Sequence, residues 1–136
     1  MKYILIIFFL LPLFSFAQHK VILNYYDNGN ILSQVHYADD LRDGSCRNYH
    51  INGTLMDEGF YINGKMSGLW ISYYNNGNIK EKGKYSHKNN NVSSFKTGTW
   101  TTYYQSGEIS SKSKIVNGKE NRKYYNKEGE LLPNDC

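Results

Sequence analysis

Residues 68–79 read Gly-Leu-Trp-Ile-Ser-Tyr-Tyr-Asn-Asn-Gly-Asn-Ile, and recognisable copies of this pattern recur on both sides of it. Residues 98–109 match best, because they keep both glycines, the Trp, the Tyr pair and the isoleucine in register. Residues 44–55 are a weaker copy with Cys in the place of Trp, and residues 25–31 and 124–131 carry only the second half. The chain is therefore expected to contain about five copies of one structural unit.

Each copy has a glycine within a turn sequence, and these glycines are Gly29, Gly53, Gly77, Gly107 and Gly129. Their separations of 24, 24, 30 and 22 residues are typical of repeat proteins. Asn-Gly flanked by Tyr and Ile is the strongest local signal for a tight hairpin, because both central residues of a type I′ turn take positive φ. The unit is therefore predicted to be a β-hairpin with a two-residue turn, as at Asn76-Gly77.

Counting outward from that turn gives the expected pairing of the two strands. The predicted cross-strand pairs are Tyr74–Ile79, Ser72–Glu81, Trp70–Gly83 and Gly68–Tyr85, and the copy before it pairs Cys46–Gly59 and Gly44–Tyr61. A glycine weakens a strand unless a ring from a neighbouring strand covers it. We therefore interpret Gly59 and Gly83 as packing residues, and Trp70 and Trp100 as core rings. Close approach of a ligand backbone to the glycines is the alternative.

The hairpins are expected to join into one sheet. Further turn signals lie between them, at Asp43-Gly44, at 63–68 and at Asn117-Gly118. We predict an all-β fold: an elongated, single antiparallel meander of about ten short strands with irregular terminal repeats. Residues 86–97 add six residues to the period and have the composition of a loop insertion, either tolerated or used in binding.

Strict alternation of residue types along the strands predicts one packed face and one solvent-exposed, or wet, face. The wet face carries one Tyr per repeat among Lys and Thr side chains. Its candidate interaction residues are Tyr73, Tyr103, Lys80 and Lys82, because Tyr is enriched at protein interfaces.

The N-terminus predicts export. Lys2 precedes an uncharged apolar run, 4–14, and small residues follow at Ser15 and Ala17, which is the pattern of a secretory signal peptide. Residues 1–17 are therefore expected to be cleaved, leaving 18–136 as one periplasmic, cell-surface or secreted repeat domain. The run is short for a membrane span, so no integral span is expected after cleavage; a retained anchor is the alternative.

Charge and titratable residues argue against several functions. Without Lys2, 15 basic residues face 12 acidic ones, interspersed along the chain, and no basic run indicates nucleic acid binding. Neither a His-x-x-x-His, a Cys-x-x-Cys nor an acidic loop of ligand spacing occurs, so a non-catalytic protein without metal or cofactor is expected. The residues considered for such chemistry are His19, His36, His50, His87, Asp39, Asp40 and Asp43.

Two cysteines, Cys46 and Cys136, could pair in an oxidising compartment. Because Cys46 stands where other copies have a core aromatic residue, a free and buried thiol is the main expectation and the disulfide is the alternative.

The unit Gly-x-Trp-x-x-Tyr-Tyr-x-Asn-Gly-x-Ile, with Gly-x-Tyr at 83–85 and Asn-Gly-Lys at 63–65, resembles the MORN-repeat variant of bacterial proteins, including antitoxin-like proteins of the YwqK type. The resemblance extends over essentially the whole mature chain. It implies a curved sheet of stacked hairpins, a role in protein or surface contact, and no catalytic motif. An antitoxin-like role would require a toxin that acts outside the cytoplasm, because the signal peptide predicts export.

Three classes of function remain. The first is a protein–protein interaction module with an unidentified protein partner. The second is a module that binds cell-wall polysaccharide or another carbohydrate by stacking sugars on exposed Trp and Tyr rings. The third is peripheral contact with an anionic membrane. The position of the rings separates them, because packed rings at Trp70, Trp100, Tyr74 and Tyr104 would remove the stacking platform and leave only Tyr73 and Tyr103 available.

Overall fold

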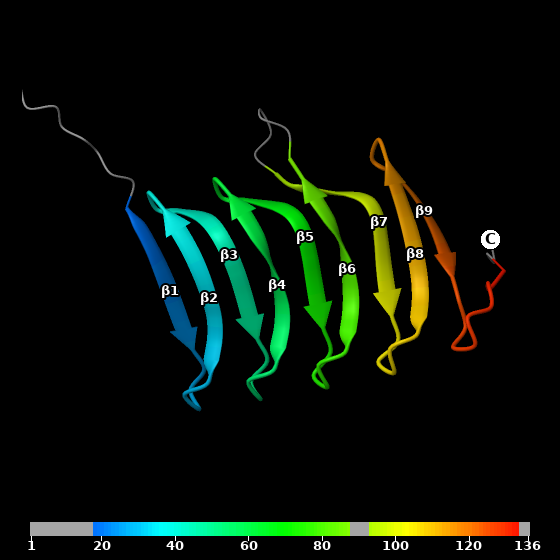
Figure 1. Ribbon diagram of the computed structural model, residues 1–136, viewed down its shortest axis with the longest axis horizontal. Helices are drawn as coiled ribbons and strands as arrows, with labels where there is room; N and C mark the ends of the chain where they lie inside the picture. Colours follow the sequence, from blue (N-terminus) through cyan, green and yellow to red (C-terminus); the bar gives the residue numbers. More distant parts are fainter. Residues whose placement is uncertain (1–17, 88–92, 134–136) are drawn as a thin grey trace, which may run out of the picture.

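The protein is an elongated row of antiparallel strands in a single sheet (Figure 1). The computed structural model describes residues 18–87 and 93–133, which form nine strands in sequence order. The strands are β1 (His19–Tyr25), β2 (Ile31–Ala38), β3 (Leu41–Tyr49), β4 (Leu55–Ile62), β5 (Lys65–Tyr73), β6 (Ile79–Ser86), β7 (Phe95–Tyr103), β8 (Ile109–Val116) and β9 (Lys119–Tyr124). The predicted all-β meander is confirmed.

Two details differ from the prediction. In place of a tenth strand there is an isolated bridge between Tyr125 and Leu131, and Pro133, two residues further on, lacks an N–H to extend the pairing. The expected insertion at 86–97 is shorter, because Ser86 ends β6 and β7 begins at Phe95. Residues 88–92, the predicted signal peptide at 1–17 and Cys136 lie outside the described residues.

The turn predicted at Asn76-Gly77 has a different geometry. The Gly77 N–H donates to the Tyr74 carbonyl at 2.8 Å, and only Gly77, at φ +85°, has positive φ in this turn. This is a three-residue loop with a glycine bulge, in which the Asn76 side chain accepts a hydrogen bond from the Asn78 N–H at 3.1 Å. The same turn recurs at Gly29 and Gly53.

The two-residue turn with two positive φ values occurs at the opposite edge of the sheet, at Asn63-Gly64 and Asn117-Gly118, as the second set of turn signals indicated. The first connection is Asp39-Asp40, at φ +46° and +64°, and not Asp43-Gly44, which lies inside β3. Asp and Asn tolerate this conformation better than other residues with a side chain.

The predicted register is confirmed along most of the central hairpin. Ser72 pairs with Glu81, Trp70 with Gly83 and Gly68 with Tyr85, and the preceding hairpin pairs Cys46 with Gly59 and Gly44 with Tyr61. Next to the turn, Tyr73 and not Tyr74 pairs with Ile79. A bulge there absorbs the difference between the three-residue loop and the predicted two-residue turn.

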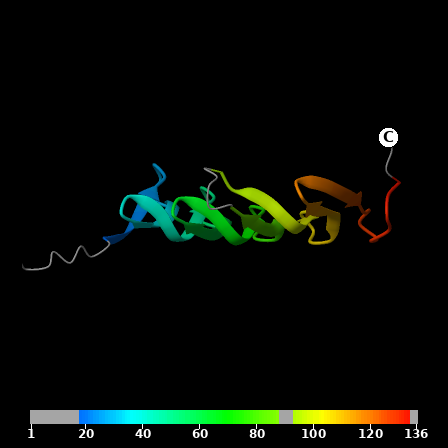
Figure 2. The ribbon, with the colours of Figure 1, turned by 90° about the horizontal axis from the view of Figure 1, so that it is seen from above.

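The strands that begin each later repeat bend sharply near their first residues, as β3, β5 and β7 show in Figure 1. The bends coincide with register shifts opposite Val35/Tyr37, Glu58/Phe60 and Lys82/Lys84. Each bulge contains a glycine at positive φ: Gly44, Gly68 and Gly98. Seen from above, the sheet is curled and not flat (Figure 2).

The core is a row of side chains on one face, which we call the packed face. Val35, Cys46, Trp70 and Trp100 are buried there. Edge-to-face contacts join the rings, with centroids 5.4 Å apart for Tyr61–Trp70, 6.1 Å for Trp70–Tyr85 and 5.1 Å for Tyr85–Trp100. Each repeat is therefore stabilised by its neighbours.

Each Trp ring lies on a strand glycine, as predicted, but on the glycine of the preceding repeat. A Cβ added to Gly59 would lie 2.2 Å from the Trp70 ring, and one added to Gly83 would lie 2.1 Å from the Trp100 ring. The prediction that Trp70 covers its own cross-strand partner Gly83 is therefore wrong. The bulge at the start of each Trp-bearing strand turns the ring back onto the previous hairpin.

In the first and last repeats, other residues take the places of the strand glycine and of the Trp ring. In the first, Val35 takes the place of the glycine and pairs with Cys46, which takes the place of the ring. In the last, Ser113 takes the place of the glycine and its hydroxyl accepts a hydrogen bond from Arg122 Nε at 2.9 Å.

Candidate interaction face

The rings that the carbohydrate hypothesis required are not exposed. Trp70 and Trp100 are only 7% and 5% exposed on the packed face. Tyr74 and Tyr104 are half-buried, and their hydroxyls donate to the Tyr103 and Tyr125 carbonyls of the next repeat at 2.7 and 2.8 Å. These four rings are therefore occupied in joining one repeat to the next.

The opposite face, which we call the open face, contains a row of cross-strand partners that crosses five strands. Ile71 pairs with Lys82, Lys82 with Thr101, Thr101 with Lys112, and Lys112 with Lys123. Directly paired residues project from the same face of a sheet. The row therefore brings three lysines of β6, β8 and β9 onto one surface.

Because side chains alternate between the two faces along each strand, further lysines lie on the same surface. We call this surface the lysine face, and it consists of Lys82, Lys84, Lys112, Lys114, Lys119 and Lys123. Among the described residues there are four ion pairs, and none of them involves these six lysines. The acidic residues next to these lysines in the sequence point to the packed face instead. There, Glu81 forms an ion pair with Lys96 at 3.1 Å, and Glu120 forms one with Arg122 at 2.6 Å. The lysine face is thus a positive surface without compensating acids in β6 to β9.

The four predicted interaction residues fall into three separate contacts. Lys82 belongs to the lysine face, and its Nζ lies 5.5 Å from the centroid of the Tyr103 ring. Tyr73 donates to Glu58 Oε1 at 2.9 Å, and burial, followed by this carboxylate, raises the pKa of its hydroxyl. Lys80 lies beside the bulge, 5.9 Å from the Tyr74 ring.

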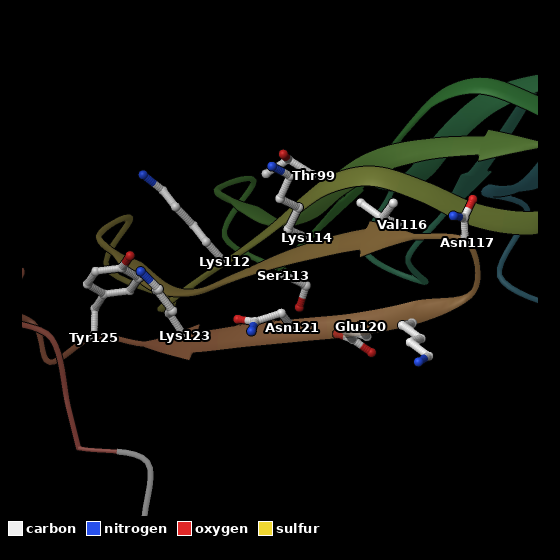
Figure 3. A pocket seen from close by; sticks show the side chains of 11 residues that line it. Thr99, Lys112, Ser113, Lys114, Val116, Asn117, Glu120, Asn121, Lys123 and Tyr125 are labelled. Carbon is white, nitrogen blue, oxygen red and sulfur yellow. The ribbon is translucent and has the colours of Figure 1, made fainter.

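A groove of about 900 Å³ deepens the lysine face at its C-terminal end (Figure 3). Lys112 and Lys114 of β8 and Lys119 and Lys123 of β9 line it, with Thr99, Tyr125 and one acidic residue, Glu120. Lys112 Nζ lies 5.9 Å from the Tyr125 ring, within the range of a cation–π contact. Sequence reasoning missed this part of the face, although the alternating Lys112-Ser113-Lys114 was a usable signal.

The residues considered for metal binding can be placed in the described parts of the chain. Across 18–87 and 93–133 no group of three or more His, Cys, Asp or Glu side chains is arranged to hold a metal ion. His50 Nε2 lies 3.2 Å from the Tyr73 carbonyl, the position that a Tyr hydroxyl takes in other repeats. The same stretches contain no helix of the length and apolarity that crossing a membrane requires.

Cys46 is buried, as expected, and its pairing with Cys136 falls outside the described residues. Burial raises the pKa of the Cys46 thiol, with a smaller contribution in the same direction from Asp57. We expect the thiol of a reduced Cys136→Ser variant to react with a disulfide reagent roughly tenfold or more slowly in the native than in the unfolded protein, because the thiolate is the reactive species. Equal rates at one pH would contradict this burial.

These stacked hairpins in one open sheet define a β-hairpin repeat protein. Three segments of the chain, 18–39, 66–87 and 96–117, match the family model described as the MORN repeat variant. They coincide with the hairpins β1–β2, β5–β6 and β7–β8, and the β3–β4 hairpin between them has the same architecture. No curated protein matches the chain. MORN repeats commonly mediate protein or membrane interactions and are generally binding modules.

Proposed function

We propose that the protein is a non-catalytic, exported interaction module that binds an acidic segment of a partner protein on the lysine face. The observation that carries the proposal is the direct cross-strand pairing of Lys112 with Lys123, beside the Lys82–Thr101 pair. Like charges placed opposite each other destabilise a sheet. The arrangement therefore lowers the stability of the free protein, and an anionic partner would reverse that effect.

The shape of the surface supports a peptide segment as the ligand. The groove beside β9 is concave and places Lys112, Lys114 and Lys123 around one channel, with the Tyr125 ring and the exposed Val116 available for apolar contact. A segment with carboxylates at alternate positions would meet these ammonium groups along an extended backbone. Of the residues predicted from the sequence, Lys82 belongs to this surface and lies beside the Tyr103 ring, whereas Tyr73 bonds Glu58 and Lys80 lies beside Tyr74.

An antitoxin- or immunity-like role is one form of this function, in which the acidic partner is a toxin acting outside the cytoplasm. Support for a protein ligand over cell-wall polysaccharide comes from the burial of Trp70 and Trp100, which withdraws the stacking platform.

Contact with an anionic membrane is the second candidate, and it is favoured by the lysines that form no ion pair with another described residue. Each lysine near an anionic bilayer surface contributes about 1 kcal/mol to binding. We favour the peptide because the groove also offers the Tyr125 ring and Val116 for apolar contact beside the lysines.

The test compares two variants with equal net charge. The face variant is Lys82→Ser/Lys112→Ser/Lys123→Ser, and the control is Lys20→Ser/Lys65→Ser/Lys127→Ser, which removes three lysines outside the lysine face. We expect the wild type and the control to retain the same acidic protein from envelope extract, and the face variant to lose it. Retention should weaken as salt is raised, because exposed charges are screened.

Vesicles with and without anionic lipid form the second arm of this test. Retention of the same proteins by the face variant and the wild type would overturn the proposal. Co-sedimentation of wild type, but not of the face variant, with anionic vesicles alone would assign the lysine face to a membrane instead.

A further inference from the structure

The two edges of the sheet differ in how well they are protected from pairing with another strand. Edge strands of natural proteins are usually defended by charge, proline, bulges or a covering segment. β9 follows this rule: four of its six residues are charged, and the Leu132 N–H donates to the Tyr124 carbonyl at 2.9 Å, which covers its end. β1 does not follow it.

β1 reads His-Lys-Val-Ile-Leu-Asn-Tyr, and all seven residues are exposed. Three successive aliphatic side chains occupy its centre: Val21 is 50% exposed, Ile22 37% and Leu23 42%. Lys20 forms an ion pair with Asp40 at 2.6 Å, so the cation is held toward the sheet. Within the described residues, this apolar edge has neither a proline nor a covering segment.

Hydrogen bonds fix which groups of β1 point outward. Gln18 accepts a bond from the Asp39 N–H at 3.4 Å, and Tyr26 donates to the Asn30 carbonyl at 2.8 Å. Residues of an antiparallel strand alternate between bonding to one neighbour and to the other. Val21 and Leu23 therefore direct their N–H and C=O groups away from β2, in position for a further strand.

We propose that β1 is a homodimer interface, in which the β1 strands of two copies pair antiparallel across a twofold axis. Full overlap of the seven residues places Ile22 on the axis and pairs Val21 with the second copy's Leu23. His19 then faces Tyr25 and Lys20 faces Asn24, so no like charges are opposed. The edge is its own complement in this register, and a twofold contact closes after two copies.

The other edge pairings fit less well. A head-to-tail contact would set the aliphatic centre of β1 against Glu120 and Arg122 of β9, which bond each other. It would also continue without limit into a filament, since the contact is not closed. Self-pairing leaves β9 and the lysine face of each copy accessible, at the far ends of the joined sheet.

The proposal is tested by the mass of the protein expressed from the full chain and purified from the cell. Light scattering over a concentration series should give twice the chain mass for the wild type and a single chain mass for Val21→Lys/Leu23→Lys. The control, Leu69→Lys/Val116→Lys, alters two side chains of similar exposure, 52% and 53%, away from the edge and should remain dimeric. A monomeric wild type, or a dimer unaffected by the edge substitutions, would overturn the proposal.

A second variant tests the register independently of folding defects. In a Cys136→Ser background, Ile22→Cys should form a disulfide between two copies on mild oxidation, because non-hydrogen-bonded partners in antiparallel strands have Cα atoms about 4.5 Å apart. Leu69→Cys in the same background should remain uncrosslinked. Equal crosslinking of both variants would show that collision, and not β1 pairing, joins the chains.

Discussion

Replacing Gly83 with valine is expected to lower the free energy of unfolding by about 3 kcal/mol, the upper part of the usual range for overpacking. The reason is steric: a Cβ at this position would lie 2.1 Å from the Trp100 ring, and the ring is also held by a bond from its Nε1 to the Lys84 carbonyl at 3.2 Å. Backbone strain is not involved, since Gly83 does not have positive φ. Denaturant unfolding followed by circular dichroism measures the change.

The matched control for this prediction is Lys84→Val, one residue along the same strand and exposed on the open face. It should change stability by less than about 0.5 kcal/mol, as surface substitutions usually do. If Gly83→Val were as stable as Lys84→Val, the ring would not be pressed against the glycine.

A second large effect is expected when the ring itself is removed. Trp100→Cys should cost about 3–5 kcal/mol, because truncating a buried Trp leaves a cavity along the row of core rings. The combination Gly83→Val/Trp100→Cys should lose clearly less than the sum of the two single changes. It reproduces the Val35–Cys46 pair, with which the first repeat interface of the same protein is already packed.

A double-mutant cycle measures this coupling. Residues in contact couple by about 0.5–3 kcal/mol, and we expect a value within that range in the direction of rescue. Additive losses would show that the Val35–Cys46 pair depends on other features of the first repeat, such as the register shift opposite Val35 and Tyr37.

The sequence was sufficient to predict the strand meander and most of its register, because the period and the alternation are both strong. The turn type was missed for a physical reason: Asn76 uses its side chain to accept a bond within a three-residue loop, so positive φ is confined to Gly77. The covering of Gly83 by Trp100 and not Trp70 was also missed, because the bulge at Gly98 redirects the ring between repeats.

The lysine face could be predicted only in part, because it is assembled from different repeats. Within one strand, Lys82 alternates with Glu81 and Lys112 with Ser113, so the local sequence shows mixed composition and no basic run. The direct pairing of Lys112 with Lys123 depends on the register of β8 and β9. The Asn117-Gly118 turn sets that register. Predicting the lysine pair from the sequence would have required pairing β8 with β9, two strands that do not belong to the same repeat hairpin.

The proposed function divides stability and recognition between the two faces of the sheet. The packed face and the turn edge hold neighbouring repeats together through Trp100 on Gly83 and the Tyr74 hydroxyl on the Tyr103 carbonyl. Lysines on the open face make little contribution to that packing, so they are available to bind a partner. Repeat proteins use extended surfaces of this kind for binding.

The most direct test of the proposed function is an NMR titration of the protein with decaglutamate, an acidic peptide, and with decaglutamine as the uncharged control. Amide shifts are expected to move along β6, β8 and β9, largest near Lys112 and Lys123, with decaglutamate only, and to disappear in Lys82→Ser/Lys112→Ser/Lys123→Ser. Equal shifts with both peptides, or shifts concentrated on the packed face around Trp70 and Trp100, would contradict binding of an acidic segment to the lysine face.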